Sequence, residues 1–322
     1  MKKILAIGES LIDFIPKEIG CELKEVTSFK RVVGGAPANV CSVIAKLGKK
    51  ANMITQLGED AFGDHIVDIL NNVGVNTEYI KRTDKANTAL AFVSLKEDGN
   101  RDFSFYRKPS ADMLLSENDI DKNWFKDTYA LHFCSVDLVE APVKYAHKKA
   151  IEYALESDAL ISFDPNVRLP LWSNNKECRD TILEFLPLAH IVKVSDEELE
   201  FITGYSDIEK AKDVLFRGNV ELILFTKGKD GIEVITKNDR ASVNGIPVNA
   251  IDTTGAGDAC IGAFLYKLLD NDISVDEIKN LDEKKLEEYI DFANYYASQT
   301  TLKSGAIESY KTIEELEIVY PF

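Results

Sequence analysis

A glycine-rich stretch at residues 252–264, DTTGAGDACIGAF, places one carboxylate, that of Asp258, among small residues. Gly255 and Gly257 can adopt positive φ angles and let the backbone approach a ligand without a side chain in the way. If a helix begins here, its first N–H groups lack partners within the helix and carry partial positive charge, which predicts an anion site. A carboxylate would repel a phosphate that was only bound there. The stretch therefore favours phosphoryl transfer, in which Asp258 takes the proton from an attacking hydroxyl group.

A purely structural origin of this stretch stays open at this point, because Asp and Thr cap helices and Gly forms turns. Two other phosphate-binding motifs are excluded. The Rossmann pattern would need a third glycine where Cys260 stands, and the chain contains no GxxxxGK[ST] sequence.

A second glycine pair, Gly34 and Gly35, precedes a predicted helix that has Pro37 in its first turn and Gly48 at its end. Paired glycines let a small ligand lie against the backbone, and Asn39 can both donate to and accept from hydroxyl groups. On its own this pattern is a weak indication of a binding site.

The rest of the sequence predicts the elements that would position these residues. Strands and helices alternate from residue 128 onward, at 128–133, 141–156, 159–164, 176–186, 190–194, 196–203, 207–217 and 221–226. This order is typical of a parallel sheet with helices on both faces. Ligands bind at the carboxyl ends of such strands, and several predicted strands here are followed by polar residues. These are Asp13, after the strand at 3–8, and Arg168, Lys193, Thr226 and Gly228.

Ser195 and Glu198 lie three residues apart at the start of the predicted helix at 196–203. This spacing is that of a capping box, in which each side chain bonds to the backbone of the other residue. Because both follow a strand, they could also face a metal–phosphate site, and the two interpretations stay open.

Residues 88–96 and 102–107 alternate as strands around Asp98-Gly99, a dipeptide typical of hairpin turns. With residues 14–33 they predict a small antiparallel sheet separate from the main one. Arg107 directly follows this hairpin. A surface salt bridge and a substrate contact are equally compatible with its position.

The charge, the cysteines and the apolar runs of the chain exclude several kinds of partner and location. A net charge of −16 argues against nucleic acid and anionic membranes as partners. Five cysteines without a CxxC pair predict reduced thiols and a cytoplasmic location, and no run is long enough for a membrane span. The apolar start of the chain is interrupted too early, at Gly8, for a signal peptide. We expect a single domain over residues 1–322.

The stretch that contains Gly34 and Gly35 resembles the N-terminal signature of the ribokinase-like (PfkB-type) carbohydrate kinases. The stretch at 252–264 resembles the C-terminal signature of the same family. The resemblance extends from Gly8 to Ala306. It implies a three-layer α/β/α fold with a mostly parallel sheet and a small antiparallel lid at about 14–33 and 86–108. Within the family, the segments at 105–114, 164–172 and 192–198 look most like those of fructokinases.

The resemblance also implies roles for individual residues. Asp258 would be the base, and the backbone of Gly255, Ala256 and Gly257 the anion hole. The sugar would contact Asp13, Gly34, Gly35, Asn39, Arg107 and Asp258. ATP would contact Arg168, Lys193, Thr226, Gly228, Gly257 and Asn294. Glu198 would hold Mg²⁺ through water, with Ser195 where the family has Asn. A monovalent cation such as K⁺ would lie near Asp252, Thr254, Thr300, Lys303, Gly305 and Ser309.

The expected reaction is ATP-dependent phosphorylation of the primary hydroxyl of D-fructose. Other substrates stay open, namely 2-keto-3-deoxygluconate, another ketose or a nucleoside, and so does a sugar-binding paralogue without turnover. The lid strand at 88–96 is apolar on both faces, which predicts a homodimer formed through the lid.

Overall fold

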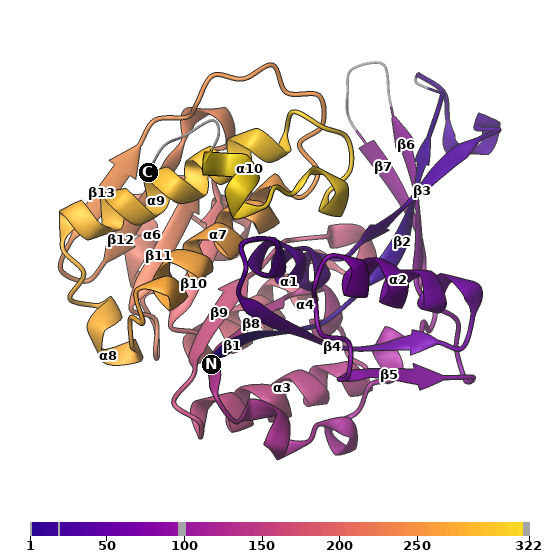
Figure 1. The fold of residues 1–322 in the computed structure, drawn as a ribbon, viewed down its shortest axis with the longest axis horizontal. Helices are drawn as coiled ribbons and strands as arrows, with labels where there is room; N and C mark the ends of the chain where they lie inside the picture. The colour runs from indigo at the N-terminus through magenta and orange to yellow at the C-terminus, as the bar shows by residue number, and fades with distance from the viewer. Residues whose placement is uncertain (1, 19, 96–100, 318–322) are drawn as a thin grey trace.

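Strands of mainly buried apolar residues form the centre of the molecule in the computed structural model, which describes residues 2–18, 20–95 and 101–317. The main sheet has nine strands in the order β13-β12-β11-β10-β9-β8-β1-β4-β5 (Figure 1). Their bounds are β1 Lys3–Ile7, β4 Lys50–Gly58, β5 Ile80–Thr83, β8 Thr128–Cys134, β9 Leu160–Asp164, β10 Ile191–Ser195, β11 Leu222–Thr226, β12 Ile232–Thr236 and β13 Arg240–Val243. From β5 to β11 neighbouring strands run parallel, and β12 and β13 are antiparallel additions at one edge. The expected mostly parallel sheet is confirmed.

Two hydrophobic cores lie on opposite faces of this sheet. One core packs under α1 Ala36–Lys46, α2 Ala61–Asn72, α7 Ala256–Asp270, α8 Val275–Ile278 and α9 Glu283–Thr300. The other packs under α3 Pro142–Leu155, α4 Asn175–Phe185, α5 Asp196–Thr203 and α6 Ile208–Leu215. A short helix, α10 Ile313–Glu317, follows near the end of the chain. The result is the predicted three-layer α/β/α arrangement.

A second sheet projects from the body of the molecule (Figure 1). Its four strands are β2 Leu11–Pro16, β3 Phe29–Gly34, β6 Leu90–Leu95 and β7 Arg101–Tyr106, in the order β3-β2-β6-β7. The β2–β3 and β6–β7 pairs are antiparallel, as expected for the lid, whereas β2 and β6 run parallel. The hairpin turn expected at Asp98-Gly99 lies outside the described residues.

Helices α1 and α7 pack closely, and this contact positions the site. A Cβ at Gly262 of α7 would lie only 2.8 Å from the Cγ1 atom of Val43 on α1, so a glycine is needed there. Asn39 and Asp258 each lie four residues before this contact, on the same faces of their helices. The helix pair therefore brings these two polar side chains together at one end of the crossing.

Among the helices of the described residues, none has the length and apolar character needed to span a membrane.

Candidate active site

Helix α7 begins behind the glycine turn that the sequence singled out. Gly255 is its N-cap residue and adopts a φ of 77°, in the left-handed region that disfavours side chains. A Cβ there would also lie 2.5 Å from Tyr310 Oη and 2.6 Å from Ala306 Cβ. The N–H group of Ala256 donates to Thr253 O at 3.2 Å. Helix α7 thus begins directly behind a turn that favours glycine, which is the position of an anion site at a helix N-terminus.

Asp258 lies in the first turn of α7 and is only 8% exposed. Its Oδ2 atom accepts a hydrogen bond of 2.8 Å from Asn39 Nδ2. Burial raises the pKa of Asp258, against the opposing effects of the Asn39 hydrogen bond and of the positive charges of Lys193 and Arg168. A carboxylate with a raised pKa, next to an anion site, is suited to act as a general base.

The second glycine pair is shaped by two neighbouring acidic residues. The carboxylate of Asp13 on β2 lies where a side chain at Gly34 would project. Gly35, with a φ of 107°, packs against the backbone of Glu9. The Glu9 side chain returns to this loop, because its Oε1 atom accepts a hydrogen bond of 3.0 Å from Ala36 N at the start of α1.

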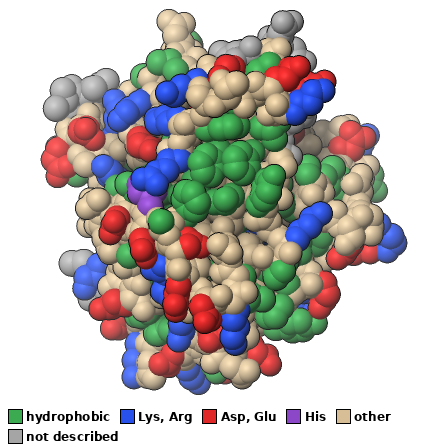
Figure 2. All heavy atoms as spheres, turned by 90° about the vertical axis from the view of Figure 1, so that its right-hand side faces the viewer, with side chains coloured by type: hydrophobic (Ala, Val, Ile, Leu, Met, Phe, Trp, Pro, Cys, Tyr) green, Lys and Arg blue, Asp and Glu red, His purple; other side chains and the backbone are tan. Residues whose placement is uncertain are grey.

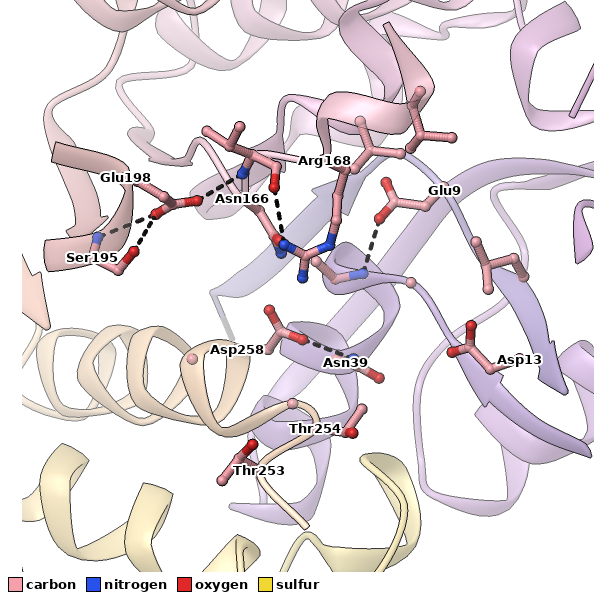
Figure 3. A pocket seen from close by; sticks show the side chains of 18 of the residues that line it. Glu9, Asp13, Asn39, Asn166, Arg168, Ser195, Glu198, Thr253, Thr254 and Asp258 are labelled. Atoms are coloured by element: carbon pink, nitrogen blue, oxygen red, sulfur yellow. Dashed lines mark hydrogen bonds between the residues drawn. The ribbon is translucent and has the colours of Figure 1, made fainter. Parts of the chain in front are cut away.

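These groups open into one cavity of about 710 Å³ between the main sheet edge and the lid (Figure 3). Predicted site residues among its lining are Asp13, Gly35, Asn39, Arg168, Lys193, Ser195, Glu198, Thr254, Gly255, Gly257 and Asp258. From the lid, Leu11, Ile15, Val93 and Phe105 add an apolar wall. Residues far apart in the chain thus meet at the carboxyl ends of the parallel strands.

Lys193 brings a buried positive charge to the anion site. Its Nζ atom lies 3.1 Å from a carboxylate oxygen of Asp164, and a Cβ at Gly257 would lie 3.3 Å from the same Nζ. Burial disfavours the charge of Lys193, but Asp164 and Glu198 raise its pKa above the usual value. Burial raises the pKa of Asp164 to about 7, although Lys193 lowers it. The amino group is therefore held charged directly beside the first turn of α7.

Glu198 and Ser195 form the expected capping box at the start of α5. Glu198 Oε2 accepts from Ser195 N at 3.1 Å and from Ser195 Oγ at 2.9 Å. Its other oxygen accepts from Val167 N at 2.6 Å. Burial opposes ionisation, but Lys193 and these hydrogen bonds lower the pKa of Glu198. The capping interpretation is correct, and the ionised carboxylate also lines the cavity (Figure 3).

Arg107 is placed differently from the expectation of a direct sugar contact. It is 6% exposed, and its Nη2 atom contacts the carboxylates of Asp112 and Asp137. It does not lie among the described residues that line the cavity. A buried guanidinium needs such paired carboxylates, and a sequence cannot show that both lie close to it. A direct contact of Arg107 with the sugar stays a prediction.

Three residues predicted to contact ATP lie outside the described lining of this cavity. Thr226 ends β11, and Gly228 follows it with a φ of 52°. Asn294 on α9 donates from Nδ2 to the carbonyl of Asn244 at 2.9 Å, which anchors the loop before the glycine turn. Their role in nucleotide binding stays a prediction.

Two of the residues predicted to hold a cation, Thr254 and Gly305, contact the Asp252 carboxylate. Its Oδ1 atom accepts from Thr254 N and Oγ1 at 2.9 and 2.6 Å, and its Oδ2 atom accepts from Gly305 N at 3.0 Å. The hydroxyl groups of Thr300 and Ser309 donate to nearby carbonyls, and Lys303 Nζ donates to Glu308 O. The structure therefore brings the 252–254 turn and residue 305 together.

Sequence reasoning missed two acidic residues of this site, Glu9 and Asp164. Asp164 is the last residue of β9 and Glu9 lies two residues after the end of β1, and these positions were the available indication. Asp164 is fully buried and paired with Lys193, and Glu9 is 3% exposed in the wall of the cavity.

A doubly covered α/β sheet, a β lid and an aspartate behind a glycine turn define a ribokinase-like kinase architecture. The family model for pfkB family carbohydrate kinases matches residues 1–313, and the chain belongs to this family. It is 42% identical to the probable fructokinase-4 of Arabidopsis thaliana, over 98% of this chain and 95% of that protein.

Solved structures agree with this assignment. A fructokinase from Xylella fastidiosa with bound ATP superposes with a TM-score of 0.90 at 31% identity and covers 98% of this chain and 96% of its own. A fructokinase from Vibrio cholerae O395, bound to fructose, ADP and a calcium ion, has a TM-score of 0.87 and 31% identity, with coverages of 99% and 98%. The expected fold and family are confirmed.

Proposed function

We propose that this protein is an ATP-dependent fructokinase that transfers the γ-phosphoryl group of ATP to the 6-hydroxyl group of D-fructose. The observation that carries the proposal is the buried Asp258, which is held by Asn39 and faces a lid-covered cavity at the N-terminus of α7. The fructokinase relatives at about the same length support fructose as the sugar.

In the proposed reaction, Asp258 takes the proton of the attacking hydroxyl as the oxygen–phosphorus bond forms. The N–H groups of residues 255–257 and the Lys193 ammonium stabilise the negative charge on the transferred phosphoryl group. Asp13, Gly35 and Asn39 hold the other hydroxyl groups of the sugar, and ADP leaves with the bond to the γ-phosphorus broken. The apolar lid wall excludes water, which limits hydrolysis of ATP.

Magnesium fits this donor set as a phosphate-bound, hydrated ion. The described residues hold no group of three or more acidic, His or Cys side chains that could cage a metal. Mg²⁺ usually keeps several waters and binds one or two carboxylates together with phosphates. Glu198, ionised and facing the cavity, would hold it through water. The ion would neutralise charge on the ATP phosphates.

The test is turnover of ATP to ADP with magnesium across fructose, 2-keto-3-deoxygluconate, ribose, glucose and adenosine. We expect fructose to give the highest kcat/KM. A preference for a different acceptor would support kinase activity and overturn fructose as the substrate. An absence of turnover with all five would favour the non-catalytic, sugar-binding paralogue.

We also propose that K⁺ binds beside Asp252, where a carboxylate and the carbonyl-rich turn at 300–309 supply hard oxygen ligands. Replacing K⁺ by tetramethylammonium should then lower kcat. Equal activity in both salts would contradict the proposal that K⁺ binds beside Asp252.

A homodimer through the lid is supported by a group of aromatic side chains on its outer face. Phe14, Phe29 and Phe92 contact one another, and Phe92 contacts Tyr106, which is 64% exposed. Figure 2 shows hydrophobic side chains gathered on the side of the molecule that holds the lid. Neighbouring residues such as Ile15 and Val93 line the cavity instead, so the lid is apolar on both faces. A monomer in sedimentation experiments would exclude this dimer.

A cytoplasmic location is supported by the cysteines. All five are free, and Cys41, Cys134, Cys178 and Cys260 are buried. Free thiols persist in reducing compartments.

A further inference from the structure

Glu9 occupies the wall of the sugar cavity with one carboxylate oxygen uncommitted. Its Oε1 atom accepts the hydrogen bond from Ala36 N at 3.0 Å. Its Oε2 atom is buried and has no hydrogen-bond partner among the described residues. The residue is 3% exposed and still lines the cavity. A buried carboxylate oxygen without a partner is costly, and Glu9 is one of the residues that line the cavity.

Within the described part of the chain, no hydrogen bond from a cation accounts for the second oxygen. Arg107 contributes favourable charge to Glu9, but its Nη2 atom contacts Asp112 and Asp137 instead. One guanidinium thus serves three buried acidic groups. Burial raises the pKa of Glu9 to about 7, despite the opposing charge of Arg107. Glu9 therefore forms no direct ion pair with Arg107, and its second oxygen lacks a hydrogen-bond partner among the described residues.

The location of Glu9 relative to the base indicates which part of a sugar it would meet. Glu9 contacts the first residue of α1, and the same helix carries Asn39, which donates to Asp258. In Figure 3, Glu9, Asp13 and Asp258 surround the cavity from three different elements. With the reacting hydroxyl at Asp258, a sugar of several hydroxyl groups would present a different one to Glu9.

We propose that Glu9 is a sugar-binding residue that determines specificity, with Oε2 hydrogen-bonded to a fructose hydroxyl other than the one that is phosphorylated. This inference rests on the proposed fructokinase activity. It also explains why a glutamate stands where a helix cap needs only one acceptor oxygen. Capping of α1 alone leaves Oε2 without a function.

The experiment compares kcat/KM for D-fructose with kcat/KM for its 1-deoxy, 3-deoxy and 4-deoxy forms, in the wild type, Glu9→Ala and Glu9→Gln. We expect Glu9→Ala to lower the value for fructose by about 10- to 100-fold, the contribution of a hydrogen bond to a charged group. For the one deoxy analogue that lacks the hydroxyl group bound by Glu9, Glu9→Ala should lower kcat/KM much less. The discrimination against that analogue would then disappear, while discrimination at the other positions remains.

Glu9→Gln keeps an acceptor for Ala36 N, and it tests the proposed role of Glu9 if Glu9→Ala does not fold. At about pH 8.5, where the wild-type carboxylate is ionised, Glu9→Gln should lower kcat/KM for fructose more than kcat/KM for that same deoxy analogue. An equal loss for fructose and all three analogues in both variants would overturn the proposal and leave helix capping as the role of Glu9.

Asp60→Asn is the matched control. Asp60 is also a carboxylate at a helix start, accepting from Phe62 N and Gly63 N at the beginning of α2, and it does not line the cavity. Its substitution should change the melting temperature without altering discrimination between fructose and any analogue. A wild-type protein without fructose turnover would contradict the fructokinase proposal itself, and the comparison would then use the sugar that is phosphorylated.

Discussion

Asn39 on α1 donates its Nδ2 hydrogen to Oδ2 of Asp258 on α7 across 2.8 Å, although 219 residues separate them in sequence. The bond joins the two glycine stretches of the chain. It orients the carboxylate within a buried site and lowers its pKa, against the larger effect of burial, which raises that pKa. The contact between α1 and α7 at Val43 and Gly262 thereby becomes part of the proposed catalytic arrangement.

Replacing Asp258 by Asn should lower kcat by about 10²–10⁴ and leave KM for fructose nearly unchanged. The substitution removes the proton acceptor and preserves the size of the side chain, and general bases contribute rate factors of this order. Steady-state kinetics with both substrates would measure the effect, and circular dichroism would verify folding. Turnover close to that of the wild type would exclude Asp258 as the base.

Replacing Asn39 by Ala should move the acidic limb of the kcat/KM profile to higher pH. A base must be deprotonated, so activity falls as pH falls through the pKa of Asp258, which burial already raises above the ordinary aspartate range. The Asn39 hydrogen bond lowers that pKa, and its loss should raise the midpoint of the limb further. Activity measured from acidic to neutral pH is the test. A smaller kcat/KM with an unchanged midpoint would show that Asn39 binds sugar without tuning Asp258.

Replacing Lys193 by Met should destabilise the protein by about 3–5 kcal/mol at pH 8, because Asp164 would be left as an unpaired buried charge. The loss should be smaller at pH 5. The pKa of Asp164 is raised to about 7 in the folded protein, so its contribution to stability is full below the unfolded pKa and declines as pH rises through 7. Removing Lys193 raises this pKa further and extends the decline to higher pH. The raised pKa of Lys193 itself contributes stability below about pH 10.4, so that part is lost equally at both pH values.

Urea unfolding at pH 5 and pH 8 measures this difference. The double variant Lys193→Met, Asp164→Asn is its control, since it has neither charge and should show no extra loss at pH 8. An equal destabilisation of the single variant at both pH values would mean that Asp164 does not ionise in the folded protein.

Replacing Gly255 by Ala should cost at least about 1–3 kcal/mol of stability, because a side chain at a φ of 77° is strained and would collide with Tyr310 and Ala306. Gly257→Ala is the matched comparison within the same turn. Its Cβ would meet only the end of the Lys193 side chain, with Nζ at 3.3 Å, and alanine favours the helix, so stability should be retained. Thermal unfolding separates the two variants. Similar melting temperatures would show that the turn at Gly255 relaxes to accept a side chain.

Local patterns were sufficient for most of the secondary structure. The helix expected at 196–203 is α5 at the same residues, and the strand expected at 221–226 is β11, one residue shorter. The glycine stretch before Asp258 does begin a helix, and Ser195 with Glu198 does form a capping box. These features depend on contacts between residues that lie close together in the sequence. The sequence alone is therefore sufficient to predict them.

The tertiary structure alone decided which charges are paired and which face the cavity. Arg107 follows the lid hairpin as expected, but Asp137, 30 residues away, helps to bury it. Glu9 enters the sugar cavity because α1 returns across the end of β1. The parallel β2–β6 pairing also joins strands far apart in sequence. Such relationships follow from the packing of whole elements, and a buried charge is stable only where that packing supplies its partner.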